Sequence, residues 1–179
     1  LIVLAAISSV IWLDSATRLE QQQTQQDLNR VITALSGELV ALDRFTNDWA
    51  GWDDTYAFIA DHNTEYIAAN LIDVTLAQSQ ISTVLYVDLD SQIVYSKTLD
   101  LSSKTPLPTS PEWLAYLPAL TRDVGLERSV TGLIQLADGR LLVAARPILT
   151  SEYIGPRRGT LVMARYLSPE VVQQLEKTS

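Results

Sequence analysis

The feature that most constrains this chain is a row of large apolar residues that recurs every seven positions. The row consists of Leu28, Leu35, Leu42, Trp49 and Tyr56. A spacing of seven returns a side chain to nearly the same face of an α-helix after two turns. The row therefore predicts one long amphipathic helix. Because no proline interrupts it, we expect this helix to run without a break to about Ile59.

The start of the chain is apolar enough to lie in a membrane. Residues 1–13, LIVLAAISSVIWL, contain two serines and no charged residue. A helix that crosses a bilayer needs ~20 such residues. We therefore expect residues 1–13 to be the outer end of a transmembrane helix that begins before Leu1, with Trp12 at the membrane–water interface. A signal peptide and an ordinary buried helix are the alternatives, although LDSA is a poor cleavage site.

Residues 14–46 are predicted to be a stalk or signalling helix. Their first half is polar and rich in glutamine, and the apolar row begins inside it. A polar stalk that carries an apolar row is typical of membrane-tethered dimers, in which two helices pair along the row. Leu28, Ile32 and Leu35 are the residues expected in such a seam. The alternative is that the row packs on its own domain; we expect this of its later half, and both interpretations stay open for residues 28–39.

The next segments predict an α+β (α/β) domain over residues 47–167. Two β-rich runs flank DLDSQ within residues 81–99, and a second hairpin is expected over residues 131–149 with Asp138-Gly139 at its turn. A last strand is expected over residues 160–167. Two hairpins and one returning strand predict a five-stranded antiparallel sheet that packs on the long helix, a PAS-like or Cache-like arrangement.

Shorter helices are expected between these strands. One lies near residues 70–76, and the proline-containing segment 105–111 is expected to be a loop. A helix should follow, with Ser110 as its cap and Pro118 ending or kinking it. The residues of its apolar face are predicted to be Trp113, Leu114, Leu117 and Leu120. Residues 168–179, SPEVVQQLEKTS, should begin an exit helix toward a second transmembrane segment.

Composition excludes several functions. The formal net charge is −8, whereas a nucleic-acid surface needs clustered Lys and Arg, so no nucleic-acid partner is expected. The chain has no cysteine, and its one histidine, His62, stands among turn formers without a partner at metal-ligand spacing. We expect no metal and no cofactor. No nucleophile elbow or phosphate-binding loop is present either.

One short stretch, DWAGWDDTY at residues 48–56, places two tryptophans, a tyrosine and three aspartates together. On one continuous helix, Trp49, Asp53 and Tyr56 would share a face, with Asp48 and Trp52 on a neighbouring one. An ionised aspartate on an apolar face must be paired or hydrogen-bonded. Two interpretations follow. Either Asp48 and Asp53, with Asp54, form a structural motif that locks the helix to later loops and strands, or Asp53 and the rings bind a cationic or polyhydroxy ligand.

Four stretches carry a resemblance to a known family. They are DRFTNDWAGWDDTYAFI, EYIAANL, VLYVDLDSQIVYSK and GTLVMARYLSPE. Together they resemble the extracytoplasmic CHASE sensor domain of the fourth class (cyclases/histidine kinases associated sensory extracellular), over roughly residues 15–167. One position departs from the family: its middle hairpin commonly has Asp-Gly at the turn, where this chain has Asp90-Ser91.

The resemblance implies a ligand-sensing module between two transmembrane helices, on the periplasmic or extracellular side of the cell membrane. The cytoplasmic side of such receptors carries a histidine kinase, a cyclic-di-GMP cyclase or phosphodiesterase, or a chemotaxis signalling region. The expected partners are a small-molecule or periplasmic ligand, the membrane, and a second copy of the chain. A membrane-tethered hydrolytic enzyme and a docking or dimerisation module without a small ligand are the alternatives.

Two arginines complete the set of candidate ligand-binding residues, Trp49, Trp52, Asp53, Tyr56, Arg146 and Arg165. Arg146 and Arg165 end the runs LLVAAR and LVMAR. Arginine binds carboxylates through two parallel hydrogen bonds, so both are candidate donors to a ligand carboxylate. The alternative is that they form salt bridges with Asp48 or Asp53.

Overall fold

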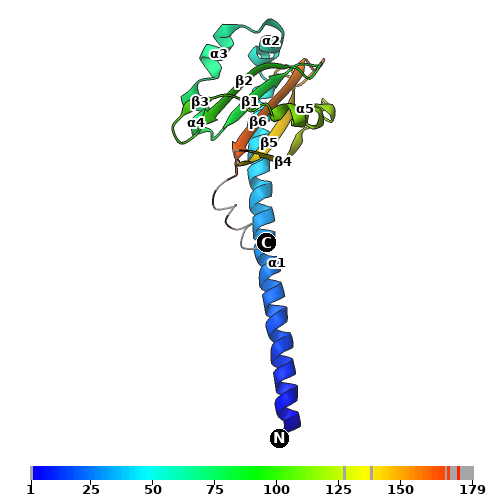
Figure 1. Ribbon diagram of the computed structural model, residues 1–179. Coiled ribbons are helices and arrows are strands. Elements are labelled where there is room, and N and C mark those ends of the chain that lie inside the picture. The colour runs from blue at the N-terminus through cyan, green and yellow to red at the C-terminus, as the bar shows by residue number, and fades with distance from the viewer. Residues whose placement is uncertain (1, 127, 138, 168, 170–172, 174–179) are drawn as a thin grey trace. The chain divides into compact units, whose positions relative to one another are not determined.

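The computed structural model of the chain describes residues 2–126, 128–137, 139–167, 169 and 173 (Figure 1). The chain divides into two units, residues 1–37 with 168–179, and residues 38–167. Each unit is considered separately. The first contains most of one long helix, and the second contains a sheet and the helices that cover it.

The long helix ends earlier than predicted. Helix α1 runs from Ile2 to Ala50, and a separate helix, α2, runs from Asp53 to Asp61. Trp52 is extended (φ −86°, ψ 138°) and precedes α2 as its N-cap. Gly51 lies at the corner and leaves room for the ring of Tyr153, since a Cβ added there would lie 2.9 Å from it. The prediction of an unbroken helix to Ile59 was therefore wrong.

Two short helices follow where one was predicted. They are α3, Thr64–Asn70, and α4, Asp73–Gln78. The chain turns between α2 and α3 at His62, which has a left-handed backbone (φ 54°) and donates its N–H to the carbonyl of Phe58. The side chain of Asn63 then accepts a hydrogen bond of 2.7 Å from Tyr66 N and caps α3. The turn formers predicted here therefore separate two helices.

The sheet has six antiparallel strands in the order β3-β2-β1-β6-β5-β4. The strands are β1 Thr83–Val87, β2 Ile93–Asp100, β3 Thr105–Leu107, β4 Val130–Leu136, β5 Gly139–Ile148 and β6 Gly159–Tyr166. The α+β class and the antiparallel sheet are as predicted. The strand count is not, because β3 forms in the segment expected to be a loop. Pro106 is tolerated there since β3 is an edge strand, which has one side without a ladder partner.

Both hairpins are present, with differences at their turns. In the β1–β2 hairpin, Ser91 takes the left-handed conformation (φ 62°), and one carboxylate oxygen of Asp88 accepts from the N–H groups of Asp90 and Gln92. Ser91 thus takes a left-handed conformation that glycine commonly takes in turns. In the β4–β5 hairpin, Gly139 (φ 149°) already pairs with Leu136. The turn therefore precedes Gly139 rather than including it, and Asp138 lies outside the described residues.

The two faces of the sheet are covered by different helices (Figure 1). Helix α5, Trp113–Arg122, buries Trp113, Leu117 and Leu120 against one face. One prediction for this helix was wrong, and another was wrong in part. Leu114 is 61% exposed, because it lies ~100° around the helix from Trp113. Pro118 lies inside the helix and does not end it.

The other face meets the end of α1 and helices α2–α4. Successive strand residues point to opposite faces, so Tyr86 and Arg146 lie on the face opposite Leu85 and Ala145, which pack on α5. Leu42 and Trp49 of α1 are buried in this second unit. The later half of the apolar row thus belongs to the domain core.

The two membrane-related predictions concern the ends of the chain. Within the described part of the chain, no helix combines the length and the apolar character that a membrane crossing requires. The expected exit helix falls on residues 168–179, of which only residues 169 and 173 are among those described. The domain limits at residues 13, 46 and 167 stay predictions.

Candidate functional site

The stretch DWAGWDDTY forms the corner between α1 and α2. Trp49, at the end of α1, is 6% exposed and stacks on Trp52 with 5.0 Å between ring centroids. Trp52 is 38% exposed. The ring centroid of Phe45, one turn earlier on α1, lies 5.6 Å from that of Trp49. The corner therefore has an aromatic interior with one indole face partly open to solvent.

Asp53 begins α2 and is hydrogen-bonded to the loop between β5 and β6. Its carboxylate accepts from Ser151 N at 2.9 Å and from Ser151 Oγ at 2.8 Å. The bond from the Ser151 backbone N–H, followed by that from the hydroxyl, lowers the pKa of Asp53. A carboxylate in the first helical turn is also favoured by the helix dipole. Asp53 thus ties the start of α2 to a segment that lies about a hundred residues later.

The predicted face shared by Trp49, Asp53 and Tyr56 does not exist, because these residues lie on two helices separated by the corner. Asp48 and Asp54 are exposed. The charge of Asp54 is the smaller of the two influences that raise the pKa of Tyr66, after burial.

Tyr56 is held by the same loop as Asp53. Its hydroxyl donates to the carbonyl of Pro156 at 3.0 Å. The guanidinium of Arg158 lies 4.0 Å from the centre of the Tyr56 ring and donates to the Tyr56 carbonyl at 3.0 Å. Arginine over an aromatic face is a cation–π contact. Two residues of the motif, Asp53 and Tyr56, therefore bind the β5–β6 loop.

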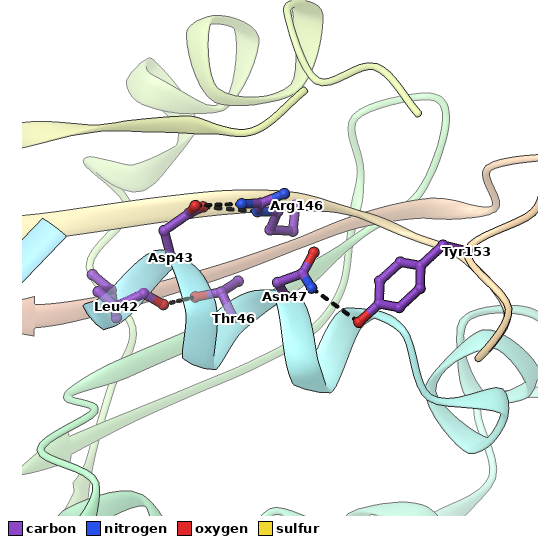
Figure 2. A network of polar contacts seen from close by, with 6 residues as sticks. All are labelled: Leu42, Asp43, Thr46, Asn47, Arg146 and Tyr153. Carbon is purple, nitrogen blue, oxygen red and sulfur yellow. Dashed lines mark hydrogen bonds and ion pairs between the residues drawn. The ribbon is translucent and has the colours of Figure 1, made fainter. Parts of the chain in front are cut away.

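A third contact to this loop comes from α1 itself. Figure 2 shows the side-chain amide of Asn47 donating to the Tyr153 hydroxyl, at 2.9 Å. The neighbour of Asn47, the buried Thr46, donates its hydroxyl to the carbonyl of Leu42, one turn earlier, at 2.8 Å. The last two turns of α1 are thus fixed both internally and to the loop.

The two candidate arginines form ion pairs with α1. Arg146 on β5 donates from Nε to Asp43 Oδ1 at 2.7 Å, and its Nη2 pairs with the other carboxylate oxygen (Figure 2). Arg165 on β6 donates from Nη1 to Glu38 at 3.2 Å. The partners are therefore Asp43 and Glu38, not Asp48 or Asp53 as the ion-pair alternative had it.

These acidic partners were missed by the sequence interpretation. Asp43 adjoins the apolar row at Leu42, and Glu38 precedes it by one turn. Two features of the sequence taken together would have indicated these pairs. Acids stand beside the apolar row of a helix that packs on a sheet, and each of the last two strands carries an arginine near its end. Both side chains of the Arg146–Asp43 pair are largely shielded from water, whereas the Glu38 side chain of the second pair is 42% exposed. The two pairs tie α1 to β5 and β6.

A buried chain of hydroxyl groups was also missed. The Thr55 and Tyr66 hydroxyls lie 2.6 Å apart, and those of Tyr66 and Tyr86 lie 2.9 Å apart. Phe58 stacks on Tyr66 at 4.6 Å and meets Tyr86 edge-on at 5.0 Å. Burial raises the pKa of Tyr66 and raises that of Tyr86 well above its usual value. Both therefore stay neutral phenols, which suits hydrogen bonding and not acid–base chemistry at neutral pH.

A surface hollow lies between α2 and α3. Its volume is about 440 Å³. Its lining consists of Asp54, Ala57, Asp61, Asn63, Glu65, Tyr66, Ala69 and Asn70. None of the six candidate ligand-binding residues lines it. Within the described residues, no three His, Cys, Asp or Glu side chains are grouped closely enough to hold a metal ion.

Comparison with known proteins places the chain in a sensory context. The CHASE4 domain family matches residues 34–179. A relative from Methanothrix harundinacea (strain 6Ac), the methanogenesis regulatory histidine kinase FilI, is 28% identical over 185 residues. That alignment covers 100% of this chain and 21% of the relative, so the chain spans about a fifth of the relative's length.

Two solved structures share the fold. The sensor domain of the histidine kinase DctB from Vibrio cholerae superimposes with a TM-score of 0.60 at 12% identity, covering 86% of this chain and 58% of that one. The extracellular domain of vpHK1S-Z8, a protein assigned as a histidine kinase, gives 0.57 at 13% identity, covering 86% and 60%. At such identities the likeness concerns the fold.

Proposed function

This chain belongs to the CHASE4 domain family, and from that premise we propose that it is the extracytoplasmic sensor domain of a transmembrane signalling receptor. The observation that carries the proposal is the attachment of α1 to the sheet. Two adjacent strands, β5 and β6, each place one arginine against an acid on α1: Arg146 against Asp43, and Arg165 against Glu38. A shift of either strand is therefore transmitted to α1.

This attachment suits a receptor better than a free-standing domain. Asp43 and Glu38 are five positions apart on α1, and their partners lie on neighbouring strands, so a tilt of the sheet and a displacement of α1 are mechanically linked. A ligand that binds one arrangement of the sheet better than another shifts the population toward that arrangement, and the position of α1 shifts with it. Helix displacement of this kind is a known route of signal transfer.

We propose a cytoplasmic output of the histidine-kinase type, because the relative from Methanothrix harundinacea is a histidine kinase. A cyclic-di-GMP cyclase or phosphodiesterase and a chemotaxis signalling region are the other outputs such a domain serves. The domain itself is proposed to be non-catalytic and to lie on the periplasmic or extracellular side of the cell membrane. Residues 1–13 and the segment after residue 167 are proposed to lead to the two flanking membrane spans.

The ligand is proposed to be a small molecule or a periplasmic component. Trp49, Trp52, Asp53 and Tyr56, with Arg146 and Arg165, remain the proposed ligand-binding residues. Their observed contacts within the domain mean that a ligand would have to compete with Ser151, Pro156 or the acids of α1. Of the six, Trp52 has the most accessible ring.

We also propose that the receptor is a homodimer paired along α1. Leu28 and Ile32 are 42% and 51% exposed, and Leu35 is half-buried. They stand at positions i, i+4 and i+7 and form one apolar stripe. Exposed apolar residues at this spacing on a helix are typical of a helix–helix seam.

A charge exchange tests the coupling. In the full-length receptor, Arg146→Asp places two acids face to face, and the double variant Asp43→Arg with Arg146→Asp restores an ion pair in reverse. We expect the single variant to shift the basal output activity in membrane vesicles and the exchange to bring it back toward wild type. Equal output from all three folded proteins would contradict the proposed coupling.

Location is tested by labelling. These 179 residues contain no cysteine, so the variant Gln78→Cys, at an exposed position of α4, introduces the single thiol of this domain. Any cysteine elsewhere in the receptor is first replaced by serine, and the receptor without Gln78→Cys gives the background labelling. A membrane-impermeant maleimide should label it in intact cells as fully as in lysed cells. Labelling only after lysis would place the domain in the cytoplasm.

A further inference from the structure

The loop between β5 and β6 touches elements on both faces of the sheet. We call residues 149–158 the β5–β6 strap. On the face of the long helix it meets the corner at α1 and α2 through four side-chain contacts. They are Ser151 with Asp53, Tyr153 with Asn47, Pro156 with Tyr56, and Arg158 with Tyr56. The backbone N–H of Leu149 also donates to the carbonyl of Ala50, the last residue of α1, at 3.1 Å.

The same strap reaches the end of α5 through Arg157. Arg157 donates from Nη1 to the carbonyl of Val124 and, at 3.5 Å, to that of Thr121. Thr121 lies in the last turn of α5, where helical carbonyls lack a partner within the helix, and Val124 follows the end of the helix by two residues. A cation there is also favoured by the helix dipole. Arg157 thus holds the end of α5 and the residues after it, while its neighbour Arg158 holds Tyr56 of α2.

The strap depends on these contacts for its conformation. Tyr153 has a left-handed backbone (φ 56°), which costs an L-residue with a β-carbon free energy. Its ring lies where a side chain at residue 51 would stand, so the glycine there makes room for it. The strap is exposed from residue 151 to residue 156. Water can therefore replace its hydrogen bonds at small cost, and opening requires far less free energy than global unfolding.

From these contacts we infer that the β5–β6 strap is a two-ended coupling device that links the end of α5 to the α1–α2 corner. Release of Arg157 from α5 loosens Ser151 and Tyr153 at the corner, and release of the corner loosens Arg157. An event on the α5 face of the sheet thereby changes the end of α1, which lies on the other face. This inference rests on the proposed sensor function for its biological meaning, but its physical content does not need a ligand.

The test is hydrogen–deuterium exchange on the full-length receptor in lipid nanodiscs, without any stimulus. Arg157→Ala removes the contact with α5. We expect amide exchange within residues 47–56 to rise about three- to tenfold, although the hydrogen bonds of the Arg157 side chain go to Thr121 and Val124 and not to α1 or α2. The matched control is Arg122→Ala, an exposed arginine in the last turn of the same helix. It should leave exchange at residues 47–56 within about twofold of wild type.

The reciprocal variant keeps the inference testable if Arg157→Ala folds poorly. Ser151→Ala removes one of the two bonds to Asp53 and should raise exchange at residues 118–124, on the far face. A rise confined to residues 118–126 in Arg157→Ala, or to the corner in Ser151→Ala, would overturn the coupling. Because no ligand or output enters the measurement, that failure would leave the proposed sensor function standing, and a failure of the sensor function would leave the exchange result unchanged.

Discussion

At the scale of single residues, the corner motif and the part of α1 before it are held by a few side chains whose partners lie far away in sequence. Asp53 and Ser151 are 98 positions apart, and Arg146 and Asp43 are 103 apart. The sequence predicts that the aspartates of DWAGWDDTY are bound by hydrogen-bond donors or cations, since an ionised carboxylate beside aromatic rings must be paired. It does not name the donors, because loop residues such as Ser151 carry no periodic signal. For the arginines, the ion-pair alternative was right in kind and wrong in its partners.

Asp53 offers a prediction in which stability and sensing separate. The folded protein has a lowered pKa at Asp53, so this carboxylate stabilises the fold above the unfolded-state pKa of about 3.9 and the contribution is lost as the pH falls through the lowered value. Asp53→Asn should therefore lower the Tm by a few degrees at pH 7 and make little difference near pH 2. Melting curves at both pH values measure this.

The exposed neighbour Asp48 provides the control for that variant. Asp48→Asn should leave the Tm at pH 7 nearly unchanged. A folded receptor with Asp53→Asn that keeps its stability but no longer responds to stimulus would assign the carboxylate to ligand binding. An Asp53→Asn receptor that is both as stable and as responsive as wild type would contradict the structural role and the ligand-binding role of Asp53.

Trp49 is predicted to be a core residue of the corner. It is buried and stacks on Trp52 and Phe45. Truncating a buried aromatic costs about 3–5 kcal/mol, so Trp49→Ala should lower the free energy of unfolding by an amount in that range. Trp52→Ala, at a ring 38% exposed, should cost clearly less. Urea unfolding of both variants decides the matter, and equal losses would mean that the two rings are equally important to the core.

At the scale of elements, the hairpins were predictable and the helix corner was not. Each hairpin is specified locally, by strand formers on both sides of a turn such as DLDSQ, where Asp88 and Ser91 stabilise the turn. The break between α1 and α2 instead depends on Tyr153 lying against Gly51, a contact across the fold. The spacing of seven continues across this break, from Trp49 to Tyr56, so the sequence pattern gives no sign that the helix ends. Strand β3 was missed because Pro106 argues against any strand except an edge.

Close packing between elements is sharpest at Gly159, the first residue of β6. A Cβ there would lie 2.4 Å from the carbonyl oxygen of Val87 on β1 and 2.9 Å from the side chain of Ile59 on α2. Because the first of these neighbours is backbone in the sheet centre, it cannot move aside cheaply. Gly159→Ala should therefore destabilise the protein by about 1–3 kcal/mol or more.

Gly132 on β4 is the matched control for Gly159. Nothing lies within 4 Å of a Cβ added there. Gly132→Ala should be neutral or stabilising by up to about 1 kcal/mol, because alanine loses less backbone entropy on folding. Thermal melts of the two variants measure the contrast. A Gly159→Ala protein as stable as Gly132→Ala would show that β6 is not held against β1 and α2 as closely as described.

At the scale of the whole molecule, the apolar row divides between two tasks. Leu42 and Trp49 are buried within the domain, whereas Leu28 is exposed and Leu35 half-buried. A single period of seven thus contributes to the core of residues 38–167 and leaves an apolar stripe on the preceding part of α1. Sequence alone left both interpretations open for residues 28–39, since periodicity gives the face of a helix and not what covers it.

The exposed stripe gives the last prediction. If two copies of the receptor pair along α1, single cysteines at Leu28, Ile32 or Leu35 should form disulfides between chains in native membranes under mild oxidation. These 179 residues contain no cysteine, so in a receptor whose other cysteines are replaced by serine each variant reports one position. A disulfide requires the two Cα atoms to lie within about 7 Å, so positions in the seam should cross-link efficiently and those facing away should not.

Asn29 and Arg30, which are exposed and one to two positions from Leu28, are the matched controls. Efficient cross-linking at Asn29 and Arg30 with little at Leu28 and Ile32 would show that the helices meet on another face, and no cross-linking at any of the five would argue against a dimer paired along this part of α1.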